Sequence, residues 1–359
     1  MKKLFLAFLI VALLLGGIAI YWYWPDIAYW WYGEEYYIEE LGYYERPEDC
    51  YEDEYYDYED KLCYLDEEFD DSLTPQFLDL VEEVFVPMEG DTEDFYSTAE
   101  STLVTYQIDG DLLVNPEEAT VSDDLLSYQD DTDTHQKIWA YYTQLIPLAY
   151  RTDLASFVVF TDGVDEVMAA VEQDLTDPEK WVLAVDIVDA QNPEELTYTL
   201  IHEFGHLLTL NSEQVEPNPA LFEDPENDLL YEQALAACPQ YFPGEGCSLP
   251  NSYINLFVQR FWADLLEEWE EINYIEDDDA YYQALDDFYW NYQDHFVTDY
   301  AVTNPGEDIA ESWTYFVLRP KPDGDTIAEQ KILFFYDFPE LVALRKQIVA
   351  RTYSRLRRQ

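Results

Sequence analysis

Alternating and continuous apolar positions predict a small sheet in the first half of the globular part. The segment "STLVTYQIDGDLLVN" alternates in polarity and predicts a hairpin around Asp109 and Gly110. "LASFVVFTDG" and "KWVLAVDIVDA" are apolar runs typical of buried strands, and the intervening "VDEVMAAVEQD" is interpreted as a helix. The remaining pattern is mostly helical, so the chain is expected to be α+β with a small sheet.

Helical spacing and capping residues predict the other elements. "PQFLDLVEEVFVPM" predicts one helix, and "DTHQKIWAYYTQLIPLAY" predicts another that ends at Pro147. "NPEELTYTLIHEFGHLLTLN" predicts a third helix, with Asn192 as its N-cap, Pro193 at its first position and Asn211 at its end. Residues 212–250 are interpreted as irregular and proline-rich.

Amphipathic segments then continue to the C-terminus. "SYINLFVQRFWADLLEEWEEI" and "DDDAYYQALDDFYWNYQDHF" predict helices, and Asn304 before Pro305 begins another in "NPGEDIAESWTYFVL". Two further helices are expected to finish the chain. The last, "FPELVALRKQIVARTYSRLRRQ", is rich in cations that can complement a helix C-terminus or pair with acidic groups.

The first 24 residues predict a transmembrane signal anchor. Lys2 and Lys3 precede an uninterrupted apolar run that ends in an aromatic cluster, "YWYW". The lysines favour a cytoplasmic N-terminus, which predicts a single-pass protein of the cell membrane whose body is extracytoplasmic. A signal peptide cleaved near Gly17-Ile18-Ala19, which would give a secreted protein, is the alternative.

Residues 25–71 alternate acids with tyrosines and predict a stalk or a poorly packed subdomain. Such a composition is too charged for a good core, although its aromatic residues could instead dock on the main domain. The globular domain is therefore assigned to residues 72–359.

Acidic residues dominate the composition. There are 78 acidic and 17 basic residues, which gives a formal net charge of −61. Such a chain repels phosphate backbones, so nucleic acid is excluded as a partner. The charge favours a well-hydrated surface, and attraction of cationic peptides is the alternative.

The four cysteines stand in two sequence-local pairs. Cys50 with Cys63, and Cys238 with Cys247, are the simplest disulfides in an oxidising compartment. A zinc site built from all four is the alternative, and the wide spacing within each pair disfavours it.

The helix that contains "HEFGH" carries the candidate chemistry. His202 and His206 are four residues apart and share one helical face, where two imidazoles can bind one tetrahedral zinc ion. Glu203 is placed to act as the general base of peptide hydrolysis. Gly205 inside the helix costs about 1 kcal/mol relative to alanine, which predicts close packing there. Two surface histidines are the alternative.

A zinc hydrolase also needs a third protein ligand and an open fourth position. The metzincin pattern is excluded, because Thr209 and Ser212 stand where it requires glycine and histidine. His135 is expected to lie on the surface, and His295 is expected to be structural.

Two glutamates four residues apart are the better candidates for the third ligand. Glu307 and Glu311 share one face of a predicted helix, so that one can bind zinc while the other holds a ligand histidine. An ordinary acidic helix start is the alternative, since acids near a helix N-terminus are stabilising.

"LIHEFGHLL" together with "YAVTNPGEDIAESW" resembles the gluzincin metallopeptidases related to the catalytic domain of anthrax lethal factor. The resemblance covers residues 197–318. It implies a zincin-like domain, one Zn²⁺ held by His202, His206 and Glu307, and Glu311 as the second acid. It also implies that Tyr300 helps to stabilise the oxyanion of the tetrahedral intermediate. The interval between His206 and Glu307 is longer here, so substrate specificity does not carry over.

These observations favour a membrane-anchored, extracytoplasmic zinc metallopeptidase that acts on peptides or proteins. The alternative is a non-catalytic, acidic surface-binding ectodomain with a structural or vestigial metal site. The presence of Glu203 favours the enzyme, because a structural site needs no general base.

Overall fold

The computed structural model describes residues 54–57, 62–65, 100–163, 167–225 and 227–356. Its contacts divide the chain into two units, Met1–Asp66 and Glu67–Gln359. In the first unit the described residues form one antiparallel pair, β1 (Glu54–Asp57) with β2 (Leu62–Leu65). Cys50 lies outside the described residues, so the Cys50–Cys63 pairing stays a prediction. The predicted helix at residues 75–88 also lies outside them.

The second unit contains a five-stranded mixed sheet in the order β4-β3-β5-β7-β6. The hairpin β3 (Ser101–Asp109) and β4 (Leu112–Glu118) turns at Gly110, whose φ of +64° suits a residue without a β-carbon. The strands β5 (Leu154–Thr161) and β7 (Trp181–Asp186) are parallel, and β6 (Ala169–Gln173) pairs antiparallel with β7 at the edge. This arrangement confirms the predicted α+β class.

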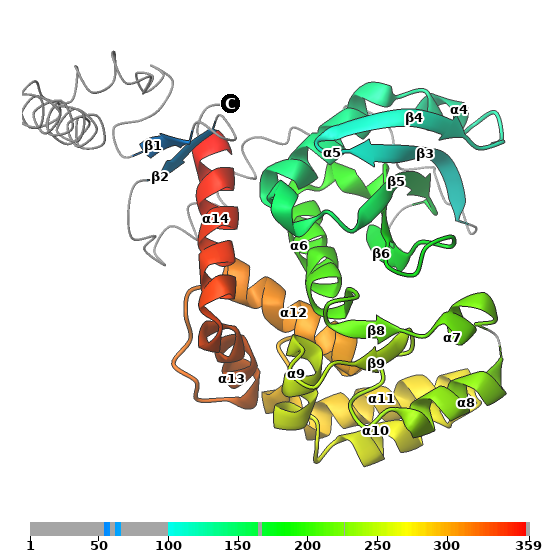
Figure 1. Cartoon of the computed structure of the whole chain (residues 1–359), viewed down its shortest axis with the longest axis vertical. Helices are drawn as coiled ribbons and strands as arrows, with labels where there is room; N and C mark the ends of the chain where they lie inside the picture. Colours follow the sequence, from blue (N-terminus) through cyan, green and yellow to red (C-terminus); the bar gives the residue numbers. More distant parts are fainter. Residues whose placement is uncertain (1–53, 58–61, 66–99, 164–166, 226, 357–359) are drawn as a thin grey trace, which may run out of the picture. The chain divides into compact units, whose positions relative to one another are not determined.

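Helices make up most of the rest of the unit. The helix α5 (Thr132–Leu145) ends before Pro147, and α6 (Pro193–Leu210) begins after its N-cap Asn192, as predicted. In Figure 1 the strands β3 to β6 lie in the upper part of the view and α8 to α11 in the lower part, with α6 running between them. The helix α12 (Pro305–Leu318) packs against α6.

The remaining elements follow α6 along the chain. They are β8 (Val215–Pro217), α7 (Pro219–Glu223), α8 (Asp228–Ala237), β9 (Gly246–Ser248), α9 (Tyr253–Phe261), α10 (Leu266–Asn273), α11 (Asp278–Asn291), α13 (Ile327–Phe334) and α14 (Pro339–Leu356), with the short α4 (Leu126–Gln129) before α5. A disulfide joins Cys238 to Cys247, as predicted. Buried Arg345 of α14 donates to the carbonyl oxygens of Phe316 and Arg319 at the end of α12, so this cation complements the C-terminus of α12 rather than that of its own helix.

Two predictions of local structure are wrong. The segment "VDEVMAAVEQD" contains the strand β6 rather than a helix, because pairing with β7 outweighs the helix propensity of its alanines and glutamates. Residues 212–250 are more regular than expected, since they contain the β8–β9 pair, α7 and α8. Asparagine side chains cap both of these helices.

The predicted single-pass membrane localisation is also contradicted. Within the described ranges, no helix is long and apolar enough to cross a membrane. The helices α6 and α14, with 18 residues each, both contain several charged residues, whereas a span needs about 20 mainly apolar ones. The predicted anchor at residues 1–24 lies outside the described part of the chain, as does most of the predicted stalk at 25–71.

Candidate metal centre

Close packing between α6 and α12 sets the geometry of the site. A β-carbon at Gly205 would lie 3.1 Å from Ala310 Cα and 3.1 Å from Trp313 Cδ1, which is tighter than ordinary van der Waals contact. The ring of Trp313 also meets Phe204 edge-on, with centroids 6.0 Å apart. The glycine of the "HEFGH" segment therefore allows the second helix to approach, as its unfavourable helix propensity predicted.

Each helix is started by an asparagine that caps it. The side chain of Asn192 accepts a hydrogen bond from Glu195 N–H at the start of α6, and Asn304 accepts from Glu307 N–H at the start of α12. Pro305 then occupies the first turn of α12, where a missing N–H costs no hydrogen bond. The cap at Asn304 places Glu307 in the first turn of α12.

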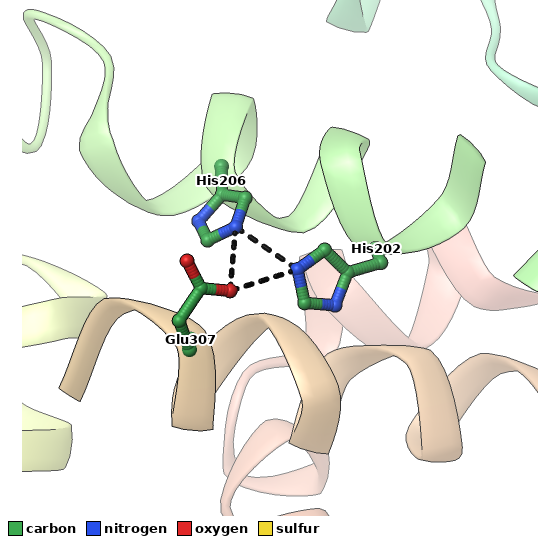
Figure 2. A group of neighbouring side chains, drawn as sticks. All are labelled: His202, His206 and Glu307. Atoms are coloured by element: carbon green, nitrogen blue, oxygen red, sulfur yellow. Dashed lines mark hydrogen bonds and ion pairs between the residues drawn. The ribbon is translucent and has the colours of Figure 1, made fainter. Parts of the chain in front are cut away.

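Three donor atoms from the two helices converge at one point (Figure 2). His202 Nε2 lies 3.0 Å from His206 Nε2 and 3.0 Å from Glu307 Oε2, and His206 Nε2 lies 3.2 Å from the same oxygen. A tetrahedral zinc ion with bonds of about 2.0–2.2 Å separates its ligand atoms by about 3.3 Å. The triangle therefore fits three corners of a zinc tetrahedron, with two imidazole nitrogens and one carboxylate oxygen as donors.

Glu311 lies one turn after Glu307 and contacts the other ring nitrogen of His202. Its Oε1 is 2.7 Å from His202 Nδ1, and its Oε2 accepts hydrogen bonds of 2.6 Å from the hydroxyls of Tyr198 and Thr298. A carboxylate can only accept, so Nδ1 carries the proton and Nε2 is left free to bind a metal. Glu311 thus orients His202 in the tautomer that a metal ligand requires.

Proton sharing dominates the electrostatics of this group in the absence of a metal. Burial opposes a charged His202, but hydrogen bonds to Glu307 and Glu311 outweigh burial and raise its pKa to about 10. Burial also favours a neutral Glu307, yet its hydrogen bonds to His202 and His206 hold the pKa of that carboxyl well below its usual range. Metal-free, the cluster therefore holds a proton at neutral pH on the atoms that would bind the metal.

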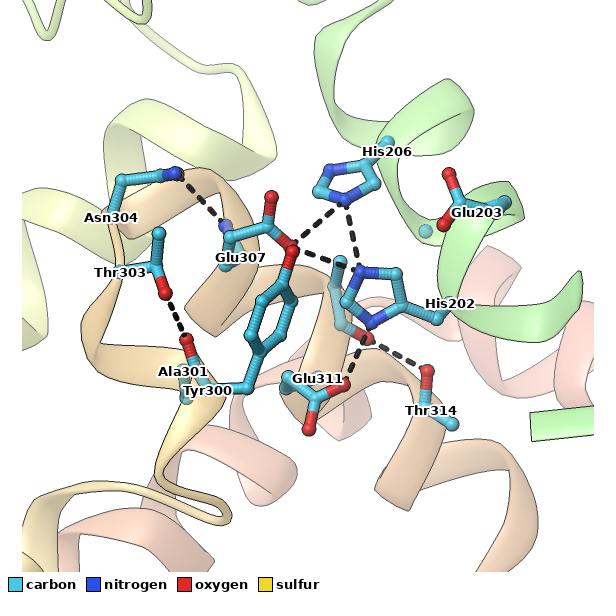
Figure 3. Close-up of polar contacts among 12 residues, drawn as sticks. His202, Glu203, His206, Tyr300, Ala301, Thr303, Asn304, Glu307, Glu311 and Thr314 are labelled. Atoms are coloured by element: carbon cyan, nitrogen blue, oxygen red, sulfur yellow. Dashed lines mark hydrogen bonds and ion pairs between the residues drawn. The ribbon is translucent and has the colours of Figure 1, made fainter. Parts of the chain in front are cut away.

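Glu203 lies beside the triangle and is not part of it (Figure 3). Its side chain is buried, and Oε2 accepts a 2.8 Å hydrogen bond from Val171 N–H of β6. Burial raises the pKa of Glu203, and the neighbouring histidines partly offset that effect. A carboxylate with a raised pKa is better matched to accepting and returning a proton near neutral pH.

Tyr300 lies next to His202 at the edge of the group. Its ring centroid is 6.0 Å from that of His202, and its side chain is half exposed. Figure 3 shows the ring directed toward Glu307 and His202. Burial and then the charges of Glu307, Glu203 and Glu311 raise the pKa of Tyr300 far above neutrality, so the phenol keeps its proton and can donate it in a hydrogen bond.

The structure brings together His202, Glu203, His206, Tyr300, Glu307 and Glu311, all of which the sequence had singled out. It keeps the other two histidines out of the group. The surface prediction for His135 is wrong, because the residue is fully buried, accepts from Tyr106 Oη and donates to Tyr128 O. Burial lowers the pKa of His135, which favours the neutral ring. His295 lies against the rings of Tyr292 and Phe296.

Sequence reasoning missed several residues of the site. Tyr198 and Thr298 hold Glu311, and Val171 holds Glu203, through contacts that no local spacing predicts. The position of Tyr198 on the same helical face as His202 was the only available signal.

Comparison of the chain with protein-family models, with curated proteins and with solved structures finds no match.

Proposed function

We propose that this protein is a zinc metallopeptidase of the gluzincin type, with a zincin-like catalytic domain. The observation that carries the proposal is the triangle of His202 Nε2, His206 Nε2 and Glu307 Oε2, whose sides of 3.0–3.2 Å suit one tetrahedral metal ion. Two nitrogens and one oxygen form the donor set typical of catalytic zinc, which keeps a fourth position open. Glu203 beside this group supports hydrolysis rather than a structural role.

Zinc held at this site would supply Lewis-acid chemistry, because it polarises a carbonyl group and lowers the pKa of water to about 7. Glu203 accepts the proton of the attacking water and then delivers it to the leaving amine. The hydroxyl of Tyr300 donates a hydrogen bond to the oxygen on which negative charge develops. Glu311 keeps His202 in place throughout, through its bond to Nδ1.

The edge strand β6 supports a peptide as the substrate. This strand lies at the edge of the sheet, and the N–H of Val171 donates to Glu203 instead of to the neighbouring strand. The outer edge of β6 therefore faces the general base. An extended peptide that adds to such an edge gains main-chain hydrogen bonds and is carried past the catalytic group.

Metal content and peptide hydrolysis, measured on the same preparations, test the proposal. The purified protein and Glu203→Gln are both expected to hold about one zinc per chain, and only the former should cleave a mixed peptide library. Glu307→Ala should lose both zinc and hydrolysis.

Glu271→Gln, a change at an exposed acid of α10, is the matched control and should leave zinc and hydrolysis unchanged. A folded protein that takes up no added zinc would refute the metal site. One that binds zinc yet cleaves nothing would point to the non-catalytic binding protein.

A further inference from the structure

A second group of carboxylates lies at the ends of the two parallel strands. Asp162 follows β5, Asp186 is the last residue of β7, and Asp189 begins the short 3-10 helix that precedes α6. One carboxylate oxygen from each of the three lies within 4.8 Å of the other two. The group shares no residue with the His202–Glu307 site, and the proposed peptidase mechanism does not use it.

The carboxylate of Asp162 is buried and incompletely satisfied. Only 5% of the residue is exposed. Its Oδ2 accepts from Val167 N–H, whereas the buried Oδ1 has no hydrogen-bond partner among the residues that the structure describes. An ionised oxygen in that position is unfavourable unless a donor or a cation meets it. The same carboxylate supplies one of the three oxygens of the group.

Asp186 connects the ends of β5 and β7, and its burial disfavours a negative charge on its carboxyl group. It is fully buried, and its oxygens accept from the N–H groups of Asp162 and Val188. Burial raises its pKa to about 7, even though these hydrogen bonds favour the charged form. In the described part of the chain, no lysine or arginine forms an ion pair with Asp162 or Asp186. A positive charge is therefore what the carboxylates of Asp162 and Asp186 lack among the described residues.

We propose that Asp162, Asp186 and Asp189 form a binding site for a hard divalent cation, with Ca²⁺ as the best fit. All three donors are carboxylates, which suit calcium rather than zinc or copper. Ca–O bonds of about 2.3–2.6 Å allow two ligands of one ion to lie up to about 5 Å apart, which accommodates the group. Water and main-chain carbonyls complete the coordination.

Such an ion would stabilise the connection that leads into the metal-binding helix. It would join the end of β5 to the end of β7 and to the turn before Asn192, which caps α6. Its principal effect is expected on unfolding rather than on chemistry, because a ligand of the folded state alone raises stability by mass action.

Thermal unfolding of the zinc-loaded full chain with added CaCl₂ tests this site, together with calcium stoichiometry by equilibrium dialysis. The melting temperature should rise with calcium in the parent protein, and about one tightly bound calcium should be found. Asp162→Asn should lose both effects and keep its zinc. Asp123→Asn, a change at an exposed acid, is the matched control and should retain both effects.

Non-specific binding is expected on a chain of net charge −61, so the difference between the variants decides the outcome. MgCl₂ at the same ionic strength separates a site for calcium from one for any divalent cation. If Asp162→Asn fails to fold, Asp189→Asn, at a less buried position, serves in its place. Failure of the parent to bind calcium, or an equal rise in all variants, would overturn the proposal. Neither result depends on peptidase activity.

Discussion

The backbone of Gly205 in α6 lies directly against Ala310 in α12. A β-carbon at position 205 would come within 3.1 Å of Ala310 Cα, which is main chain and cannot rotate away. Along α6, Gly205 stands between His202 and His206. Along α12, Ala310 stands between Glu307 and Glu311. The absence of a side chain at Gly205 thus determines how closely the two helices approach, and with it the size of the donor triangle.

Gly205→Ala is expected to weaken zinc binding even though alanine is the better helix former. Alanine gains about 1 kcal/mol of helix propensity, but overpacking against Ala310 and Trp313 costs about 1–3 kcal/mol and forces the helices apart. Zinc affinity, measured by competition with a chromophoric chelator, should fall while the helical circular dichroism stays unchanged. An affinity equal to that of the parent would show that the triangle does not depend on this contact.

Glu311→Gln should lower zinc affinity without removing a ligand. Three donors, from His202, Tyr198 and Thr298, meet the Glu311 carboxylate, whereas an amide offers one acceptor and a competing NH₂ group. Loss of such an outer partner typically costs about 10–100-fold in metal affinity. Tyr198→Phe, which removes one donor and leaves the carboxylate, is the control and should have a smaller effect. Equal effects of the two variants would contradict an orienting role for Glu311.

Zinc uptake should release a proton at neutral pH. The pKa of His202 is raised to about 10 without metal, so the cluster holds its proton at pH 7 and zinc must displace it. Apparent affinity should therefore rise with pH by about tenfold per unit, until the pH reaches the pKa of the cluster. Calorimetry in buffers of different ionisation enthalpy counts the protons.

The same pKa shift fixes the sign of the pH dependence of the metal-free protein. The pKa of His202 is raised in the folded state. The protonated His202 therefore contributes its full stabilisation below the ordinary histidine pKa of about 6.5. That contribution is lost as the pH rises toward 10. Glu311→Gln removes one of the causes of the raised pKa and should reduce both effects. Zinc binding without proton release would contradict the shared proton.

The site could be predicted from the sequence where its geometry is local. His202 and His206 share a helical face by spacing alone, and Asn192 and Asn304 mark the starts of their helices by residue type. The spacing of residues along the chain does not indicate that these two helices pack against each other. The choice of Glu307 came from a family resemblance, and the close approach at Gly205 shows how the two segments meet.

What could not be predicted depends on contacts between distant segments. The segment of β6 has the residues of a helix and becomes a strand only because β7 lies beside it, which places Val171 against Glu203. His135 lies in a polar stretch and is buried because Tyr106, from a strand of the sheet, covers it. Both cases were decided by tertiary pairing rather than by local preference.

Asp308 of α12 and Lys331 of α13 form a buried ion pair. Removal of one partner alone is expected to destabilise the fold, because the other charge is then buried without compensation. Both side chains are fully buried, and Asp308 also accepts from Trp262 Nε1. Lys331→Met leaves an uncompensated buried carboxylate beside Glu307 and should lower the free energy of unfolding by about 3–5 kcal/mol.

The double variant Lys331→Met with Asp308→Leu separates the charge from the packing. It removes the uncompensated carboxylate, so it should recover most of the lost stability, apart from about 1–3 kcal/mol for the Trp262 N–H left without its acceptor. Urea unfolding of the zinc-loaded proteins measures all three species. If the double variant were no more stable than Lys331→Met alone, the uncompensated carboxylate would not be the cause of the loss, and the desolvation argument would be wrong.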